Sequence, residues 1–108
     1  MVKTRLLRWT DRAQTDLLAI GRFIARDKPD AARNWVEALR IRAQKVIEQP
    51  FSGRQVPEIG REDIREVLHD NYRIVYIVLE KTIDVLVVFE GHKLLPKQQI
   101  EARSKRPS

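Results

Sequence analysis

The stretch from Asp63 to Pro96, DIREVLHDNYRIVYIVLEKTIDVLVVFEGHKLLP, decides the fold of this chain. It contains three runs rich in β-branched and aromatic residues, separated by short polar breaks at Asp70-Asn71 and Glu80-Lys81. Asx residues tolerate the left-handed backbone of tight hairpins, so the first break predicts a hairpin turn. Apart from its arginine, the middle run, Tyr72 to Leu79, is apolar at both alternating sets of positions, as in a strand buried on two faces. We therefore predict a three-stranded antiparallel meander with this run as its central strand.

Two helices are expected before the meander. Thr10 offers an N-cap, and an apolar stripe at helical spacing covers residues 11–26. Pro29 suits the first position of a second helix, which ends before Pro50. Only a few residues join the two, so an antiparallel helical hairpin is expected. A weak alternation over Val2–Arg8 predicts a short first strand, which gives the order β-α-α-β-β-β and an α+β fold with the helices packed on the sheet.

The chain is expected to form one domain over residues 1–96, followed by a basic polar tail. Residues 51–60 contain two glycines and a proline and are interpreted as a surface loop. From Lys97 to Ser108 the sequence is polar, with Ile100 as its apolar exception. Such a tail forms either a short surface helix or a disordered segment.

Composition limits the functional classes. The 108 residues include no cysteine, which excludes thiol nucleophiles and cysteine-bound zinc, and no apolar run is long enough to span a membrane. Two histidines far apart, without an acidic cluster, do not provide metal-ligand spacing, so we expect neither a metal nor a cofactor. The net charge of +6 and the pI near 10.1 favour anionic partners or reflect a solvated basic surface. We expect a cytoplasmic protein.

Arg65 and Arg73 are the first candidate site residues, because a guanidinium within an apolar strand must reach an anion or extend to solvent. A hairpin loop of two or four residues places Arg65 opposite Tyr76 and Leu68 opposite Arg73, on opposite faces of the sheet. A one-residue bulge would instead bring the two arginines to one face.

The alternative interpretation of these arginines is structural, with the guanidinium groups paired to Glu66 and Glu90 near the edge of the sheet.

His92 and Lys93 are the remaining candidates, because they directly follow the last strand and its Gly91. A histidine there can act as a general acid or base, and a lysine can hold a phosphate. The alternative is a solvent-exposed loop, since no carboxylate is placed by spacing to orient the ring. Trp9 and Trp35 lie beside or on the apolar stripes, where packing is favoured over base stacking.

Several segments together resemble one family. They are the helical hairpin followed by QPFSGRQVPEI (49–59), IREV (64–67), NYRIVYIV (71–78) and VLVVFEGHKLLP (85–96). Over residues 2–96 the chain resembles the RelE/ParE superfamily of small bacterial toxins from type II toxin-antitoxin operons. The long helices, the FSGR loop and the LLP ending are more similar to the ParE branch.

The resemblance implies two possible activities. RelE-like members are ribosome-dependent mRNA endonucleases, and ParE-like members inhibit DNA gyrase. Arg73 matches the arginine of the RelE central strand, and His92-Lys93 occupy a place where RelE-like proteins carry an arginine or histidine. No aromatic residue follows Phe89, and Arg65 is the only basic residue of its strand. These departures favour a ParE-like gyrase inhibitor, with the RNase as the alternative and a member that has lost toxicity as a third possibility.

The resemblance also implies a partner, a cognate antitoxin whose C-terminal segment folds across the toxin as a helix and an added strand. Oligomers would then form through the toxin-antitoxin complex. The candidate edges for the added strand are Val2–Arg8 and Ile64–His69.

Overall fold

The computed structural model describes residues 4–104, and the side chains of residues 4–101. It confirms an α+β fold with two helices between the first strand and the meander. In chain order the elements are β1 (Leu6–Trp9), α1 (Asp11–Ala25), α2 (Pro29–Gln44), a 3-10 turn (Lys45–Ile47), β2 (Arg54–Gln55), β3 (Ile64–His69), β4 (Tyr72–Val78), β5 (Thr82–Glu90) and α3 (Lys97–Ser104).

The sheet has five strands in the order β1-β5-β4-β3-β2. The antiparallel meander β3-β4-β5 is confirmed, and β4 lies at its centre with all seven residues buried. β1 extends the sheet beyond β5 and runs parallel to it. The chain between these two parallel strands includes the helical hairpin and the strands β2, β3 and β4, which gives the long connection that a parallel neighbour requires. For the predicted strand Val2–Arg8, residues 2 and 3 lie outside the described part of the chain, and the observed strand begins at Leu6.

β2 corrects the prediction of an irregular loop over residues 51–60. Its two residues pair with β3, Arg54 opposite Glu66 and Gln55 opposite Arg65. Gly53 makes this approach possible, because a Cβ atom there would lie 2.7 Å from the Glu66 carbonyl oxygen and would also meet the Tyr76 hydroxyl. β3 is consequently an inner strand at Arg65 and Glu66, so the expectation of a free edge over Ile64–His69 is wrong for those two residues.

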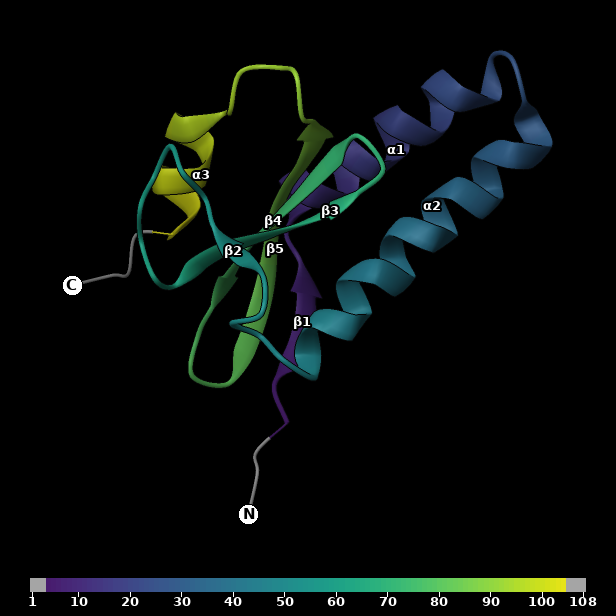
Figure 1. Cartoon of the computed structure of the whole chain (residues 1–108). Coiled ribbons are helices and arrows are strands. Elements are labelled where there is room, and N and C mark those ends of the chain that lie inside the picture. The colour runs from purple at the N-terminus through teal and green to yellow at the C-terminus, as the bar shows by residue number, and fades with distance from the viewer. Residues whose placement is uncertain (1–3, 105–108) are drawn as a thin grey trace.

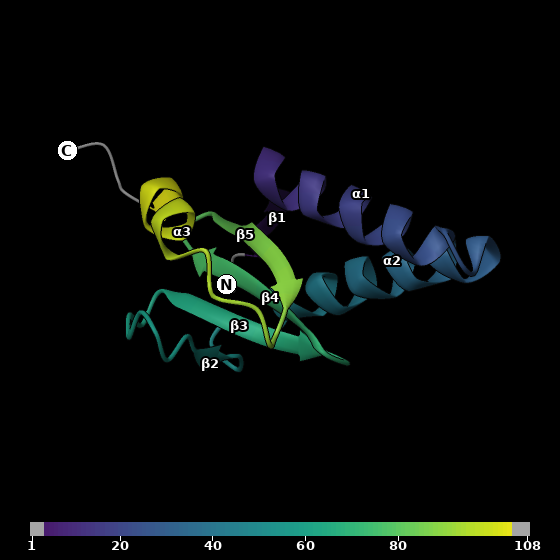
Figure 2. The same cartoon turned by 90° about the horizontal axis from the view of Figure 1, so that it is seen from above.

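Helices cover both faces of the sheet. Figure 2 shows the α1-α2 hairpin on one side of the sheet and α3 on the other. Under the hairpin lies the larger apolar core, which includes Leu17, Ile20, Leu39, Val46, Val67, Ile74, Tyr76, Ile83 and Val88. The opposite face has a smaller core, formed by Val56, Ile64, Val75, Ile77, Leu86, Val87 and Ile100. Two covered faces explain why β4 is apolar at both alternating sets of positions.

The helical hairpin begins at a residue that also holds the sheet. The Thr10 hydroxyl accepts a hydrogen bond from the Ala13 amide at 3.2 Å and donates to the Val85 carbonyl at 2.8 Å. Pro29 occupies the start of α2, as predicted. The turn between the helices lies away from the sheet (Figure 1), and Phe23 near that turn is exposed.

The hairpin between β3 and β4 has a loop of two residues, Asp70 and Asn71, which is one of the two loop lengths considered above. Asp70 takes a positive φ of 51°, the left-handed conformation expected of an Asx residue there. The register places Arg65 opposite Tyr76 and Leu68 opposite Arg73. Arg65 and Arg73 therefore lie on opposite faces of the sheet.

The segment after Pro96 forms α3 over Lys97–Ser104, the helical one of the two expected alternatives. Its Ile100 is fully buried in the smaller core. The tryptophans pack as expected: Trp35 contacts Tyr72 edge-on at 4.8 Å between ring centroids, and Trp9 packs against the larger core.

Candidate functional site

Three of the four predicted site residues lie at the same end of the sheet: Arg73, His92 and Lys93. Arg73 lies on β4 opposite Phe89 of β5. A Cβ atom on Gly91 would lie only 3.6 Å from Arg73 Cδ. The loop that carries His92 and Lys93 therefore leaves β5 directly beside the Arg73 side chain.

The Arg73 guanidinium is held by two carboxylates. Its Nε donates to Glu66 Oε1 at 2.7 Å, and its two terminal nitrogens donate to Glu58 at 2.8 and 2.9 Å. The Glu66 side chain is fully buried and also binds the Arg54 Nε, whereas Glu58 is 41% exposed. The guanidinium lies 5.0 Å from the centre of the Phe89 ring. The Nε and both terminal nitrogens of Arg73 thus donate to carboxylates of the protein itself. In this arrangement the charge of the guanidinium is neutralised by Glu58 and Glu66.

The pairing changes the acidity of the exposed partner. The hydrogen bonds from Arg73 lower the pKa of Glu58 from 4.5 to about 2, although partial burial opposes this shift. The Arg73 pKa is raised, first by the Glu58 hydrogen bond and then by Glu66, against the opposing effect of burial. Glu58 therefore stays ionised at any pH near neutrality and has no proton to give as a general acid there.

His92 has a carboxylate neighbour that the sequence spacing did not indicate. Its Nε2 lies 3.3 Å from Glu90 Oε2, and Lys93 Nζ lies 3.6 Å from the other Glu90 oxygen. Both side chains are about two-thirds exposed, His92 at 68% and Lys93 at 64%. Glu90 therefore orients the histidine only loosely, in contact with solvent.

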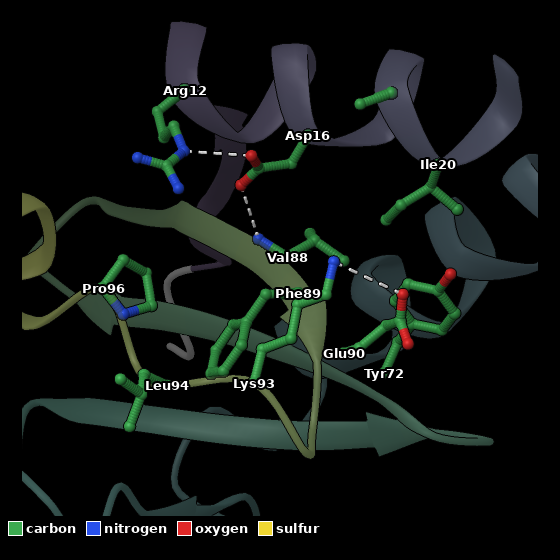
Figure 3. Close-up of a pocket in the computed structure, with 11 residues that line it drawn as sticks. Arg12, Asp16, Ile20, Tyr72, Val88, Phe89, Glu90, Lys93, Leu94 and Pro96 are labelled. Carbon is green, nitrogen blue, oxygen red and sulfur yellow. Dashed lines mark hydrogen bonds and ion pairs between the residues drawn. The ribbon is translucent and has the colours of Figure 1, made fainter. Parts of the chain in front are cut away.

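A cavity of about 260 Å³ lies between α1, the end of β5 and the loop after it (Figure 3). On its polar side Asp16 accepts hydrogen bonds from the Arg12 Nε and the Val88 amide, both at 2.9 Å, and Lys93 pairs with Glu90. The remaining lining residues are mostly apolar, namely Ala19, Ile20, Tyr72, Phe89, Leu94 and Pro96. The cavity offers apolar surface with charges that are already paired.

Arg65, the fourth predicted site residue, lies elsewhere and has a structural role. It donates to the Glu62 carbonyl at 2.8 Å and to the Gly53 carbonyl at 3.1 Å. Its guanidinium also stacks on Phe51 at 5.3 Å from the ring centre. Tyr76 on the same face donates to the Pro50 carbonyl at 2.7 Å. Arg65 and Tyr76 thus fix the chain that leads into β2.

The structural interpretation of the arginines is right for one contact and wrong for others. Glu66 pairs with Arg73 as that interpretation expected, but Glu90 faces the His92 loop instead. Glu58 was missed, because it lies in a segment without periodicity. Glu66 carries a readable signal: it alternates with Ile64 on the face that the smaller core covers, where an acid needs a partner.

Within the described residues, no group of three or more His, Asp or Glu side chains is arranged to hold a metal ion. No helix in that part of the chain is long and apolar enough to cross a bilayer.

Solved structures share this fold. The chromosomal ParDE toxin-antitoxin system from P. aeruginosa superposes with a TM-score of 0.70 at 20% identity, covering 81% of this chain and 96% of that one. A double mutant of the E. coli toxin RelE in the free state gives 0.69 at 19% identity, covering 94% and 99%. The same RelE mutant bound to an antitoxin RelBc peptide gives 0.56 at 20% identity, covering 97% and 99%. The fold is therefore that of the RelE and ParE toxins.

Sequence comparison gives the family. Residues 7–94 match the ParE toxin of the type II toxin-antitoxin system parDE. The candidate toxin Y4kP of Sinorhizobium fredii is 34% identical over 93 residues, which cover 84% of this chain and 93% of Y4kP. The chain belongs to the ParE toxin family of type II toxin-antitoxin systems.

Proposed function

We propose that this toxin arrests growth in the cytoplasm by inhibiting DNA gyrase, and that a cognate antitoxin neutralises it. The observation that carries the proposal is the pairing of Arg73 with Glu58 and Glu66. An inhibitor acts through the shape and charge of its surface, so a guanidinium committed to internal carboxylates does not impair it.

The RNase alternative would require Arg73, Arg65 and His92 to take part directly in the chemistry. Cleavage of RNA through its 2′-hydroxyl needs a cation free to stabilise the phosphate and an acid or base that is held in place. Here Arg73 is shared between two carboxylates, Arg65 holds a loop on the other face, and His92 is two-thirds exposed. This arrangement supports the inhibitor over the nuclease.

The antitoxin partner is proposed because solved structures with this fold include one from a ParDE toxin-antitoxin system and one of RelE in complex with an antitoxin peptide. In the described residues β1 ends one side of the sheet, so Leu6–Trp9 is the edge that we propose for an added strand. Hydrogen exchange on the complex tests this. Protection of Leu6–Trp9 amides is expected, and unchanged exchange there would rule out this edge.

The decisive experiment is expression from an inducible promoter with and without the neighbouring antitoxin, followed by two assays on purified toxin. We expect growth arrest only without the antitoxin, blocked supercoiling by gyrase, and intact mRNA on translating ribosomes. Cleavage of that mRNA, lost in His92→Ala, would establish the nuclease instead. Normal growth with abundant folded toxin would indicate a member that binds its antitoxin but has lost toxicity.

A further inference from the structure

A groove of about 270 Å³ lies on the α3 side of Arg73. Its lining combines the Arg73 guanidinium and two lysines with two leucines, and consists of Glu58, Arg73, Gly91, Lys93, Leu94, Leu95 and Lys97. The lysines are only loosely neutralised: Lys93 lies 3.6 Å from Glu90, and Lys97 lies 4.0 Å from Glu101. Glu58 is the one carboxylate of the lining, and it occupies the outer edge of the Arg73 guanidinium.

The two carboxylates on Arg73 differ in how firmly they are held. Glu66 is fully buried and cannot leave without exposing Arg73 to an apolar surrounding. Glu58 is 41% exposed, so it can return to water while Glu66 keeps the guanidinium neutralised. The two terminal nitrogens of Arg73 thus form a site that binds both oxygens of one carboxylate. Glu58 fills this site, and another carboxylate can replace it.

We propose that this groove binds an acidic segment of a protein partner, and that Glu58 occupies the site until a glutamate or aspartate of the partner replaces it. The internal occupant shows that a carboxylate fits the guanidinium fork in two-point contact. Leu94 at the rim is 96% exposed, and an apolar side chain beside the acid would cover it. A nucleic acid backbone would match the cations but not the leucines, so the lining favours a peptide.

The inference rests on the proposed function in one respect, the identity of the partner protein, which would be the antitoxin or another bound protein. The binding of an acidic segment in the groove does not depend on that function. Binding of a model peptide can therefore be measured without any assay of growth or of gyrase. A chain that binds the peptide but leaves gyrase active would overturn the proposed function and leave this inference standing.

The test uses the full chain and a fluorescent peptide of alternating glutamate and leucine, blocked at both ends, with anisotropy as the readout. A glutamine-for-glutamate peptide and an oligothymidylate of equal length are the alternative ligands. The variants are Glu58→Ala and the matched control Glu62→Ala, which changes the net charge equally on an exposed residue of the same loop. Circular dichroism checks folding, and Glu58→Gln replaces the alanine variant if that one does not fold.

We expect the acidic peptide to bind Glu58→Ala at least about threefold more tightly than the wild type, because the substitution removes the Glu58 carboxylate that competes with the peptide for Arg73. The gain is modest because Glu58 is partly exposed, and a partly exposed ion pair is weak. Glu62→Ala should match the wild type, and the glutamine peptide should bind to none of them. Equal gains in both variants would mean that net charge alone is responsible, which would overturn the proposal. Tighter binding of the oligothymidylate to Glu58→Ala, without binding of the peptide, would overturn it in favour of a nucleic acid.

Discussion

Glu66 and Glu58 bind the same guanidinium, but burial gives them different energetic weight. Glu66→Ala should lower the free energy of unfolding by about 3 kcal/mol, because it leaves a largely buried arginine without its inner counter-ion. Glu58→Ala should cost about 1 kcal/mol or less, because its side chain is 41% exposed and water replaces it. Urea denaturation of both variants measures the difference. Equal losses would mean that the exposed Glu58 anchors Arg73 as strongly as the buried Glu66, which would contradict this difference.

The lowered pKa of Glu58 also predicts a pH dependence. Its carboxylate has a pKa of about 2 in the folded chain against 4.5 ordinarily, so its contribution is complete above pH 4.5 and is lost as the pH falls towards 2. We expect the stability difference between wild type and Glu58→Gln to be constant from pH 7 to pH 5 and to shrink between about pH 4.5 and pH 2. Thermal melts at pH 7, 5, 4 and 3 test this. A difference that stays constant to pH 3 would contradict the Arg73 pairing.

The chemistry of single residues identified Arg65 and Arg73 as positions that need a partner, but it did not identify the partners. An arginine inside an apolar strand needs an anion, and for Arg73 the structure supplies two. Its outer partner Glu58 could not be predicted, because no periodicity places a loop residue against a strand. Arg65 was chosen by the same argument as Arg73, yet its donors go to backbone carbonyls, which leave no mark in a sequence.

Among the elements, the start of α1 joins two layers of the fold. Thr10 caps the helix and also donates to the β5 carbonyls of Val85 and Leu86. Thr10→Ala should lower the free energy of unfolding by about 1–2 kcal/mol, since it removes both the cap and a contact to the sheet. Thr15→Ala, at an exposed position within α1, is the matched control and should be neutral or slightly stabilising. Equal losses in the two variants would refute a special role for Thr10.

Elements with a clear period were predictable, and those defined by long-range pairing were not. The meander and both helices follow from alternation and from apolar stripes with recognisable ends. β2 has two residues, which is too short for any period, and the parallel partner of β1 lies more than 70 positions away in the chain. The second helix was expected to continue to the residue before Pro50, whereas α2 ends at Gln44 and a 3-10 turn follows. Such details depend on packing.

At the scale of the whole molecule, the role of Arg73 in stability must be separated from a role in activity. Arg73→Ala alone is uninformative, because it removes the buried one of the two arginines that neutralise Glu66, leaving the half-exposed Arg54, and should destabilise the chain by about 3 kcal/mol. Replacing both members of a buried pair by apolar residues of similar size is often neutral for stability. The double variant Arg73→Met with Glu66→Leu therefore removes the guanidinium while the fold is kept.

We expect this double variant to remain folded, to block gyrase supercoiling and to arrest growth as the wild type does, because the proposed inhibitor does not use Arg73 chemically. Circular dichroism and urea denaturation report on the fold, and the supercoiling and growth assays report on activity. A nuclease would behave differently, since without the guanidinium it should lose its rate by two or more orders of magnitude while remaining folded. A stable double variant that no longer arrests growth and no longer inhibits gyrase would therefore place Arg73 in the functional machinery and count against the inhibitor proposed here.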